Sequence, residues 1–411
     1  MWTILERCRL HVANVIHYLQ RGGGVAVQAL NIAQQIEFVG VSTSFSTIES
    51  KCKDFTTTRL IERYQGRIIT SRKPALPLDP FKLSRSLKAS LREDHCNVIQ
   101  AFDPLVSGLA AYSVKQSQRE IPLIIRLGTT YLAHFAFQFA LSKTGSIRSF
   151  FESATKKKLL LPMLSVIEHA TLQTADMVIA NCDYLRCVYE NLYPDLKNIT
   201  VIKNGVNTTV FTPDGPSEDL NSGKPTLLYV GRLEARKGLD YLFHAMVKVL
   251  RKHPDSRLFL VGRAPDLGYQ SRLKKLAFSL SISTKIKFLG PVDNQLVPRL
   301  MRSADVLVFP SSTHGEEIEG LPNSVLEALA TGLPVVATGI CGVPEVVKDN
   351  YNGFLVTPGS VDELVSSINT LLDSGSLRYQ FSENARKSVL NNYSMTVIAK
   401  KYLKLYQHLV S

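Results

Sequence analysis

The stretch that decides the fold of this chain is residues 304–337, which read ADVLVFPSSTHGEEIEGLPNSVLEALATGLPVVA. Its first seven residues form an apolar run that ends at a proline, as a buried strand of a parallel sheet would. The run SVLEALA at 324–330 has the apolar spacing of a short helix, and TGLPVVA at 331–337 is typical of a helix stop followed by a second buried strand. This order of strand, loop, helix and strand predicts an α/β fold.

Two glutamates lie on either side of the predicted helix start. Glu319 falls in the loop, and Glu327, eight positions later, falls about one turn inside the helix. Asn323 or Ser324 is expected to cap this helix, whose first backbone N–H groups have no partners within the helix and carry the positive end of its dipole. The pattern predicts an anion site between two carboxylates that can accept hydrogen bonds from hydroxyl groups. Taken alone, each glutamate could instead be a solvated surface charge.

Length and composition indicate two domains. A chain of 411 residues is long for a single hydrophobic core. Strand-like and helix-like stretches alternate in both halves, which is typical of doubly wound sheets. The segment 204–225 is rich in Gly, Pro, Asn, Ser and Asp. It predicts a linker between a first domain over 1–203 and a second domain over 226–395.

The stretch from Ala304 to Pro344 resembles the retaining glycosyltransferases of family 4, whose hallmark is a pair of glutamates at this spacing in a strand–loop–helix context. The resemblance is weaker over 10–175 and clear over 176–395. It implies the GT-B fold, in which two Rossmann-like domains face each other across a cleft. The first domain would bind the acceptor and the second the nucleotide-sugar donor. The resemblance also implies that a last helix, at 396–411, packs back on the first domain.

The donor side of the expected site includes the basic loop GRLEARKG at 231–238, which directly follows a predicted buried strand. In open α/β sheets, ligands bind at this edge. Arg232 and Lys237 match the pair that holds the donor diphosphate in the family, and guanidinium and ammonium groups suit that task. The resemblance assigns the donor-sugar hydroxyls to Glu319 and the ribose hydroxyls to Glu327, with Glu319, Arg232 and Lys237 as the catalytic set. The donor-binding residues that it implies are Gly23, Gly24, Gly231, Arg263, Val292, Leu321, Pro322, Asn323, Ser324 and Glu327.

One position departs from the family pattern. Many members have a histidine before the glycine that ends the strand corresponding to 121–127, whereas here Leu127 takes that place. The departure leaves the acceptor side of the site less defined than the donor side. The polar candidates there are Asp103, Arg126 and His134.

The resemblance implies transfer of a hexose-type sugar from a UDP- or GDP-sugar to an acceptor hydroxyl, with retention at the anomeric carbon, in polysaccharide or glycolipid biosynthesis. The leaving phosphate oxygen would take the acceptor proton, so that no protein nucleophile is needed. The sequence has no D-x-D motif, and basic side chains with a helix dipole can neutralise the diphosphate. We therefore expect a metal-independent enzyme without a cofactor.

Two alternatives share the donor site: a nucleotide-sugar-binding protein without transfer activity, and an epimerase of the same fold. A dinucleotide-dependent oxidoreductase would need a G-x-G-x-x-G fingerprint, which is absent.

The net charge of +13 predicts an anionic partner. Basic and aromatic residues are not interleaved as in nucleic-acid-binding modules, so nucleic acid is not expected. The segment 142–164 is basic and apolar enough to lie on an anionic membrane surface, although a solvated helix face explains it equally well. The acceptor would then be a sugar or a lipid-linked glycan.

The location expected from the sequence is the cytoplasm, with peripheral attachment to the inner face of the membrane. No apolar run reaches the roughly 18 residues that span a bilayer, and the first residues lack the pattern of a signal peptide. The six cysteines are scattered and predict reduced thiols.

Overall fold

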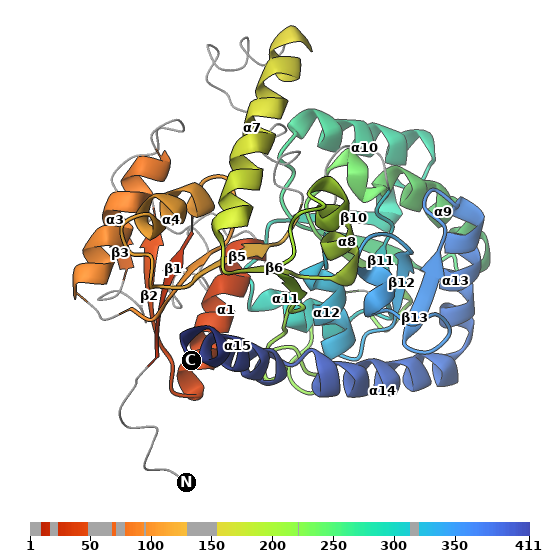
Figure 1. Ribbon diagram of the computed structural model, residues 1–411. Helices are drawn as coiled ribbons and strands as arrows, with labels where there is room; N and C mark the ends of the chain where they lie inside the picture. Colours follow the sequence, from red (N-terminus) through yellow and green to blue (C-terminus); the bar gives the residue numbers. More distant parts are fainter. Residues whose placement is uncertain are drawn as a thin grey trace. The chain divides into compact units, whose positions relative to one another are not determined.

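The computed structural model describes residues 10–16, 24–47, 68–70, 79–93, 96–129, 154–220, 222–312 and 320–411. Contacts divide the chain into two compact units. Unit 1 comprises Met1–Asn204, Glu316–Leu321 and Met395–Ser411, and unit 2 comprises Gly205–Gly315 and Pro322–Ser394. Each unit is built around its own parallel sheet (Figure 1).

Unit 1 contains a seven-stranded parallel sheet with the order β3-β2-β1-β4-β5-β6-β7. Runs such as LIIRL in β5 are buried along their whole length, as strands covered on both faces must be. The strands are β1 (His11–Val15), β2 (Ser42–Thr47), β3 (Ile68–Thr70), β4 (Val98–Ala101), β5 (Leu123–Leu127), β6 (Met177–Ala180) and β7 (Ile199–Val201). The helices are α1 (Gly24–Phe38), α3 (Asp79–Glu93), α4 (Ser107–Lys115), α7 (Ala154–Thr174), α8 (Asp183–Leu192) and α15 (Met395–Val410).

Helix α15 brings the end of the chain back to unit 1. In Figure 1 this dark blue helix lies beside the red helix α1. Its residues Ile398, Tyr402 and Tyr406 are fully buried in one core with Ile32 of α1. The Tyr406 hydroxyl donates to Oε1 of Gln100 in β4 at 2.8 Å, so the contact is polar as well as apolar.

Unit 2 contains a six-stranded parallel sheet with the order β10-β9-β8-β11-β12-β13. Its strands are β8 (Thr226–Val230), β9 (Arg257–Val261), β10 (Ile286–Gly290), β11 (Val306–Phe309), β12 (Val335–Thr338) and β13 (Gly353–Val356). Its α-helices are α9 (Leu239–Lys252), α10 (Leu267–Ser279), α11 (Leu296–Arg302), α12 (Asn323–Ala330), α13 (Val361–Asp373) and α14 (Gly375–Asn392). Short 3-10 turns are η3 (Ala235–Lys237), η4 (Ser283–Lys285) and η5 (Val343–Glu345). The predicted α/β fold class with two Rossmann-like units is confirmed.

The strand order of unit 2 positions its candidate site. From β8 the chain builds outward through β9 and β10, and then it returns to add β11 on the other side of β8. The strand order therefore switches between β8 and β11. The loops that follow these two neighbouring strands both start at the carboxyl edge of the sheet. Such a switch in strand order leaves a crevice in which open α/β sheets bind their ligands.

The segment 205–225 lies in unit 2, where two arginines hold it by its backbone. Arg386 of α14 donates to the carbonyls of Thr208 and Phe211, and Arg302 donates to that of Thr212. This stretch therefore has fixed contacts within unit 2.

The helix start between the two motif glutamates differs from the prediction. Helix α12 begins at Asn323, its N-cap is Pro322 in an extended conformation, and no side chain caps it. The prediction that Asn323 or Ser324 caps the helix is therefore wrong. Both residues already lie inside the first turn, because the fixed φ of proline suits the position where the chain enters the helix.

Among the described helices, none is long and apolar enough to cross a bilayer.

Candidate active site

The carboxyl ends of β8 and β9 are in close backbone contact. Gly262 has a φ of 140°, and a Cβ there would lie 1.9 Å from the Gly231 carbonyl oxygen. The Gly231 amide donates to the Val261 carbonyl at 2.9 Å. Position 262 therefore requires glycine, since any other residue would be strained at this φ and its Cβ would clash with the Gly231 carbonyl. Peptide groups of the two strands are consequently packed against each other at this edge of the sheet.

The loop after β8 carries three basic side chains, two of which pair with one buried carboxylate. Glu234 forms ion pairs with Arg232, at 2.9 Å, and with Arg236, at 3.0 Å. The Arg236 side chain is largely buried, whereas that of Arg232 is 34% exposed. Glu234 therefore orients the Arg232 guanidinium and leaves part of it accessible. Glu234 was not among the predicted site residues, although it is the single acid in the basic loop GRLEARKG, a pattern that indicates such a partner.

Lys237 links the β8 loop to the end of β11. It is 4% exposed, and its Nζ lies 5.1 Å from the centre of the Phe309 ring. The next residue, Gly238, has a φ of 67°, and a Cβ there would lie 1.9 Å from the Pro310 carbonyl oxygen. The Ser312 amide donates to the Arg236 carbonyl at 2.8 Å. The two loops at the switch in strand order are thus locked together by contacts that need glycine at 238.

Glu327 is the most perturbed acid of unit 2. It lies in the second turn of α12, and burial raises the pKa of its carboxyl to about 7. Within the described part of the chain, no hydrogen bond or ion pair reaches this carboxylate. The residue is half-buried, so a carboxylate that has no donor within the protein can still receive hydrogen bonds from a ligand.

The remaining donor-side residues follow successive strands of the same sheet. Arg263 comes after β9 and is exposed, and its carbonyl accepts from the Leu233 amide at 2.9 Å. Val292 comes after β10 and is half-buried. Pro322, Asn323 and Ser324 form the uncapped start of α12 after β11. The residues predicted from the β8, β9, β10 and β11 loops therefore share one edge of one sheet.

Other predicted residues fall in unit 1 or outside the described residues. Leu321 belongs to unit 1 by its contacts, and Gly24 is the first residue of α1. Glu319, Gly23 and His134 lie outside the described residues.

The two described acceptor-side candidates both have partners in the fold. The Asp103 carboxylate accepts from the backbone amides of Val106 and Ser107 and so caps the start of α4. Arg126 is 3% exposed and donates to Tyr402 and Asn204. These contacts give both side chains a role in holding unit 1 together.

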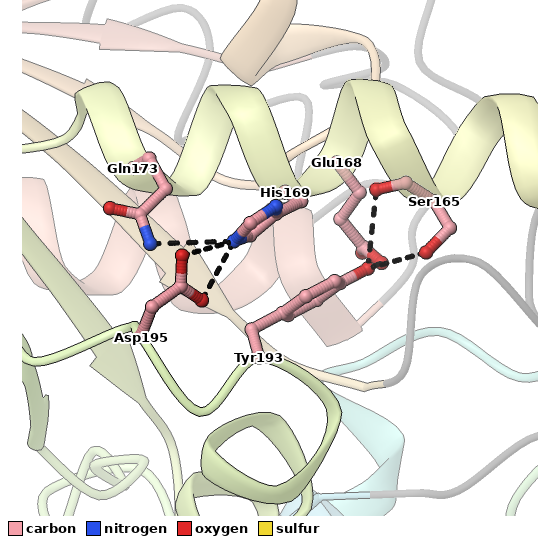
Figure 2. A network of polar contacts seen from close by, with 6 residues as sticks. All are labelled: Ser165, Glu168, His169, Gln173, Tyr193 and Asp195. Atoms are coloured by element: carbon pink, nitrogen blue, oxygen red, sulfur yellow. Dashed lines mark hydrogen bonds and ion pairs between the residues drawn. The ribbon is translucent and has the colours of Figure 1, made fainter.

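Unit 1 also holds a buried acid that the sequence analysis did not identify (Figure 2). Glu168 of α7 is 1% exposed and accepts from the hydroxyls of Tyr189 at 3.0 Å and Tyr193 at 2.9 Å. Burial raises the pKa of its carboxyl to about 7, against the opposing effect of the two hydrogen bonds. The His169 ring stacks on Tyr193 and contacts Asp195 at 2.9 Å. The signal in the sequence was a lone glutamate inside the largely apolar run MLSVIEHATL.

Solved structures of other proteins share the architecture of this chain. Sucrose-phosphate synthase from Thermosynechococcus elongatus superposes with a TM-score of 0.76 at 21% identity, over 98% of this chain and 99% of that one. Anabaena HepE in complex with UDP-glucose superposes with a TM-score of 0.74 at 19% identity, over 97% and 100%. The chain therefore has the GT-B fold.

Two family models assign the chain more closely. The model of glycosyl transferases group 1 matches residues 211–388, and that of Glycosyltransferase Family 4 matches residues 22–210. The two matches adjoin and together run from 22 to 388. The protein belongs to the group 1/family 4 glycosyltransferases, as the sequence analysis predicted.

Two curated relatives resemble about half of the chain. An uncharacterised glycosyltransferase of Methanocaldococcus jannaschii is 32% identical over 51% of this chain and 54% of its own length. A GDP-mannose-dependent alpha-(1-6)-phosphatidylinositol monomannoside mannosyltransferase of Mycobacterium tuberculosis is 30% identical over 52% of this chain and 57% of its own length. The chain thus spans little more than half the length of these relatives.

Proposed function

We propose that this protein transfers a hexose-type sugar from a nucleoside-diphosphate sugar to an acceptor hydroxyl, with retention at the anomeric carbon. The observation that carries the proposal is the half-buried Glu327 carboxylate, which has a raised pKa and no described partner, and which lies in the second turn of a helix without a side-chain cap. The helix follows β11, and the basic loop follows β8, the strand next to β11 at the switch in strand order. One edge of unit 2 thus carries a carboxylate that can bind hydroxyl groups and basic groups that can bind a diphosphate.

The proposed roles follow from the chemistry of each group. Glu327 accepts hydrogen bonds from the ribose hydroxyls, and the first amides of α12 receive diphosphate oxygens. Arg232 grips two phosphate oxygens with its exposed part, while Lys237 adds a buried point charge. Glu319 keeps its proposed role toward the hydroxyls of the donor sugar.

The proposed reaction needs no protein nucleophile. As the bond between the anomeric carbon and the phosphate oxygen breaks, negative charge develops on the leaving diphosphate. Arg232, Lys237 and the helix dipole stabilise that charge in the transition state. The leaving oxygen takes the proton of the acceptor hydroxyl, which attacks the same face of the sugar. We propose metal-independent transfer because these groups themselves supply the positive charge.

The nucleobase is proposed to be uracil or guanine. A mannosyltransferase among the relatives is named as GDP-mannose-dependent, and HepE is described with UDP-glucose. Since the base would meet the loops after β9 and β10 largely through backbone atoms, the residues there do not separate the two.

The acceptor is proposed to be a sugar or lipid-linked glycan in polysaccharide or glycolipid assembly at the inner face of a membrane. The chain carries a net charge of +13, and helix α7 exposes Met163 and Val166. Lys156–Lys158 lie in the first turns of the same helix. Binding to phosphatidylglycerol vesicles, lost when these three lysines are changed to glutamate, tests this attachment.

The test of the activity is release of nucleoside diphosphate from a panel of UDP- and GDP-sugars, with acceptor glycans and with EDTA present. Arg232→Gln should lower turnover strongly. Arg236→Gln is the matched control, because Arg236 pairs with the same Glu234 but its side chain is only 11% exposed. Equal turnover by wild type and Arg232→Gln contradicts the proposed site. Nucleotide binding without product, with every acceptor, favours a binding protein or an epimerase.

A further inference from the structure

The side chain of Asn204 contacts Leu321, the residue that precedes the N-cap of helix α12. Asn204 follows β7 and is 4% exposed. Its Oδ1 accepts from Nη2 of Arg126 at 2.7 Å, and its Nδ2 donates to the Leu321 carbonyl at 2.8 Å. These three residues belong to unit 1 by their contacts.

The chemistry of Arg126 fixes which way the Asn204 amide points. A guanidinium has only donors, so the oxygen of Asn204 must face it and the NH2 group must face Leu321. Arg126 is held in turn by the buried hydroxyl of Tyr402, which accepts from Nε at 2.6 Å. The donor that Asn204 presents to Leu321 is therefore oriented by a strand and a helix rather than by the loop itself.

The Leu321 carbonyl leads directly into helix α12. Its carbon is bonded to the nitrogen of Pro322, the N-cap of that helix. Because a peptide group is planar, a hydrogen bond that fixes this carbonyl also fixes the plane through which the chain enters the helix. Because proline has no N–H, the carbonyl oxygen is the atom through which this peptide group can form a hydrogen bond.

A second contact holds the preceding residue at the same place. The Gly320 amide donates to the Gly128 carbonyl at 3.3 Å. A Cβ on Gly320 would lie 2.0 Å from Oδ1 of Asn181. The pair Gly320–Leu321 is thus seated by close backbone approach as well as by Asn204.

We propose that Asn204 is a positioning residue, which sets the Leu321 peptide group and through it the first turn of α12 for binding the donor diphosphate. The inference rests on the proposed function. It assigns a role in donor binding to a residue whose own side chain is buried and directed at the protein backbone.

The substitution that tests the inference is Asn204→Asp. The aspartate keeps the size of the side chain and pairs with Arg126, but it turns an acceptor toward the Leu321 carbonyl. Loss of one such hydrogen bond corresponds to a factor of roughly 3 to 10. We expect the Kd for UDP or GDP, measured by calorimetry, to rise by up to that factor. The unfolding midpoint should fall as well, because the hydrogen bond also exists without ligand, so the Kd is the readout that a merely structural role would not move.

The matched control is Asn352→Asp. Asn352 is fully buried, its Oδ1 accepts from the Lys348 amide at 2.7 Å, and its Nδ2 donates to the Val346 carbonyl at 3.0 Å. It precedes β13 and so lies at the amino edge of the sheet of unit 2, opposite the candidate site. This variant should lower the unfolding midpoint and leave the Kd unchanged.

The outcomes separate the inference from the function beneath it. If Asn204→Asp binds nucleotide with the Kd of the wild type, Asn204 has no positioning role. If the wild type binds neither UDP nor GDP, the proposed function fails and the inference fails with it. Should Asn204→Asp not fold, Asn204→Ala removes the same donor and gives the same reading from its Kd.

Discussion

Replacing Glu168 with glutamine should remove most of the pH dependence of the stability of unit 1. Glu168 is 1% exposed, and its carboxyl accepts from the hydroxyls of Tyr189 and Tyr193. Figure 2 shows the contact with Tyr193. Glutamine has the same shape, and its amide can accept from one hydroxyl and donate to the other. It therefore mimics the protonated acid and cannot ionise.

The magnitude follows from the pKa of the carboxyl. Burial raises it from 4.5 to about 7, and each pKa unit corresponds to about 1.4 kcal/mol. Between these two values the folded state holds a proton that the unfolded state has released. The stabilisation is complete below pH 4.5 and is lost as the pH rises through about 7. Ionising this buried group thus costs the folded protein on the order of 3 kcal/mol.

Calorimetric unfolding at about pH 5 and about pH 8.5 tests this reasoning. The two proteins should have similar midpoints at the lower pH. At the higher pH, Glu168→Gln should unfold roughly 6–12 °C above the wild type, since about 1 kcal/mol shifts the midpoint of a domain of this size by about 2–4 °C. Glu383→Gln, on the exposed face of α14, controls for the loss of one negative charge. Parallel pH dependences for wild type and Glu168→Gln would refute the assignment.

Three further substitutions test unit 2. Glu327→Gln should weaken UDP or GDP binding about tenfold at pH 8. The wild type should lose affinity as the pH falls below about 7, the pKa of Glu327, whereas the variant should show no such loss. Titration calorimetry at several pH values measures both effects. Gly238→Ala should cost more than 2 kcal/mol in urea unfolding because its Cβ meets the Pro310 carbonyl, whereas Gly290→Ala, with a φ of 70° and open space, should cost only about 1 kcal/mol; equal costs would contradict the contact. Glu234→Gln should raise KM for the donor by releasing Arg232, and an unchanged KM would show that this ion pair does not orient the guanidinium.

The candidate donor site was predictable wherever it depends on short spacing in the chain. The interval between Glu319 and Glu327, and the basic loop with Arg232 and Lys237, are local features of the sequence. The acceptor side was less predictable. Asp103 and Arg126 are polar residues at strand ends, but what they contact depends on a helix start and on a helix more than two hundred residues away.

The sequence by itself determined the alternation of strands and helices, the α/β class and the positions of the motif residues. These properties follow from apolar periodicity and turn residues, which act over a few neighbours along the chain. Only the tertiary structure decided the strand order that sets the loops after β8 and β11 side by side. It also decided the raised pKa of Glu168 and Glu327, because the cost of ionisation depends on which elements cover a carboxyl and remove it from water.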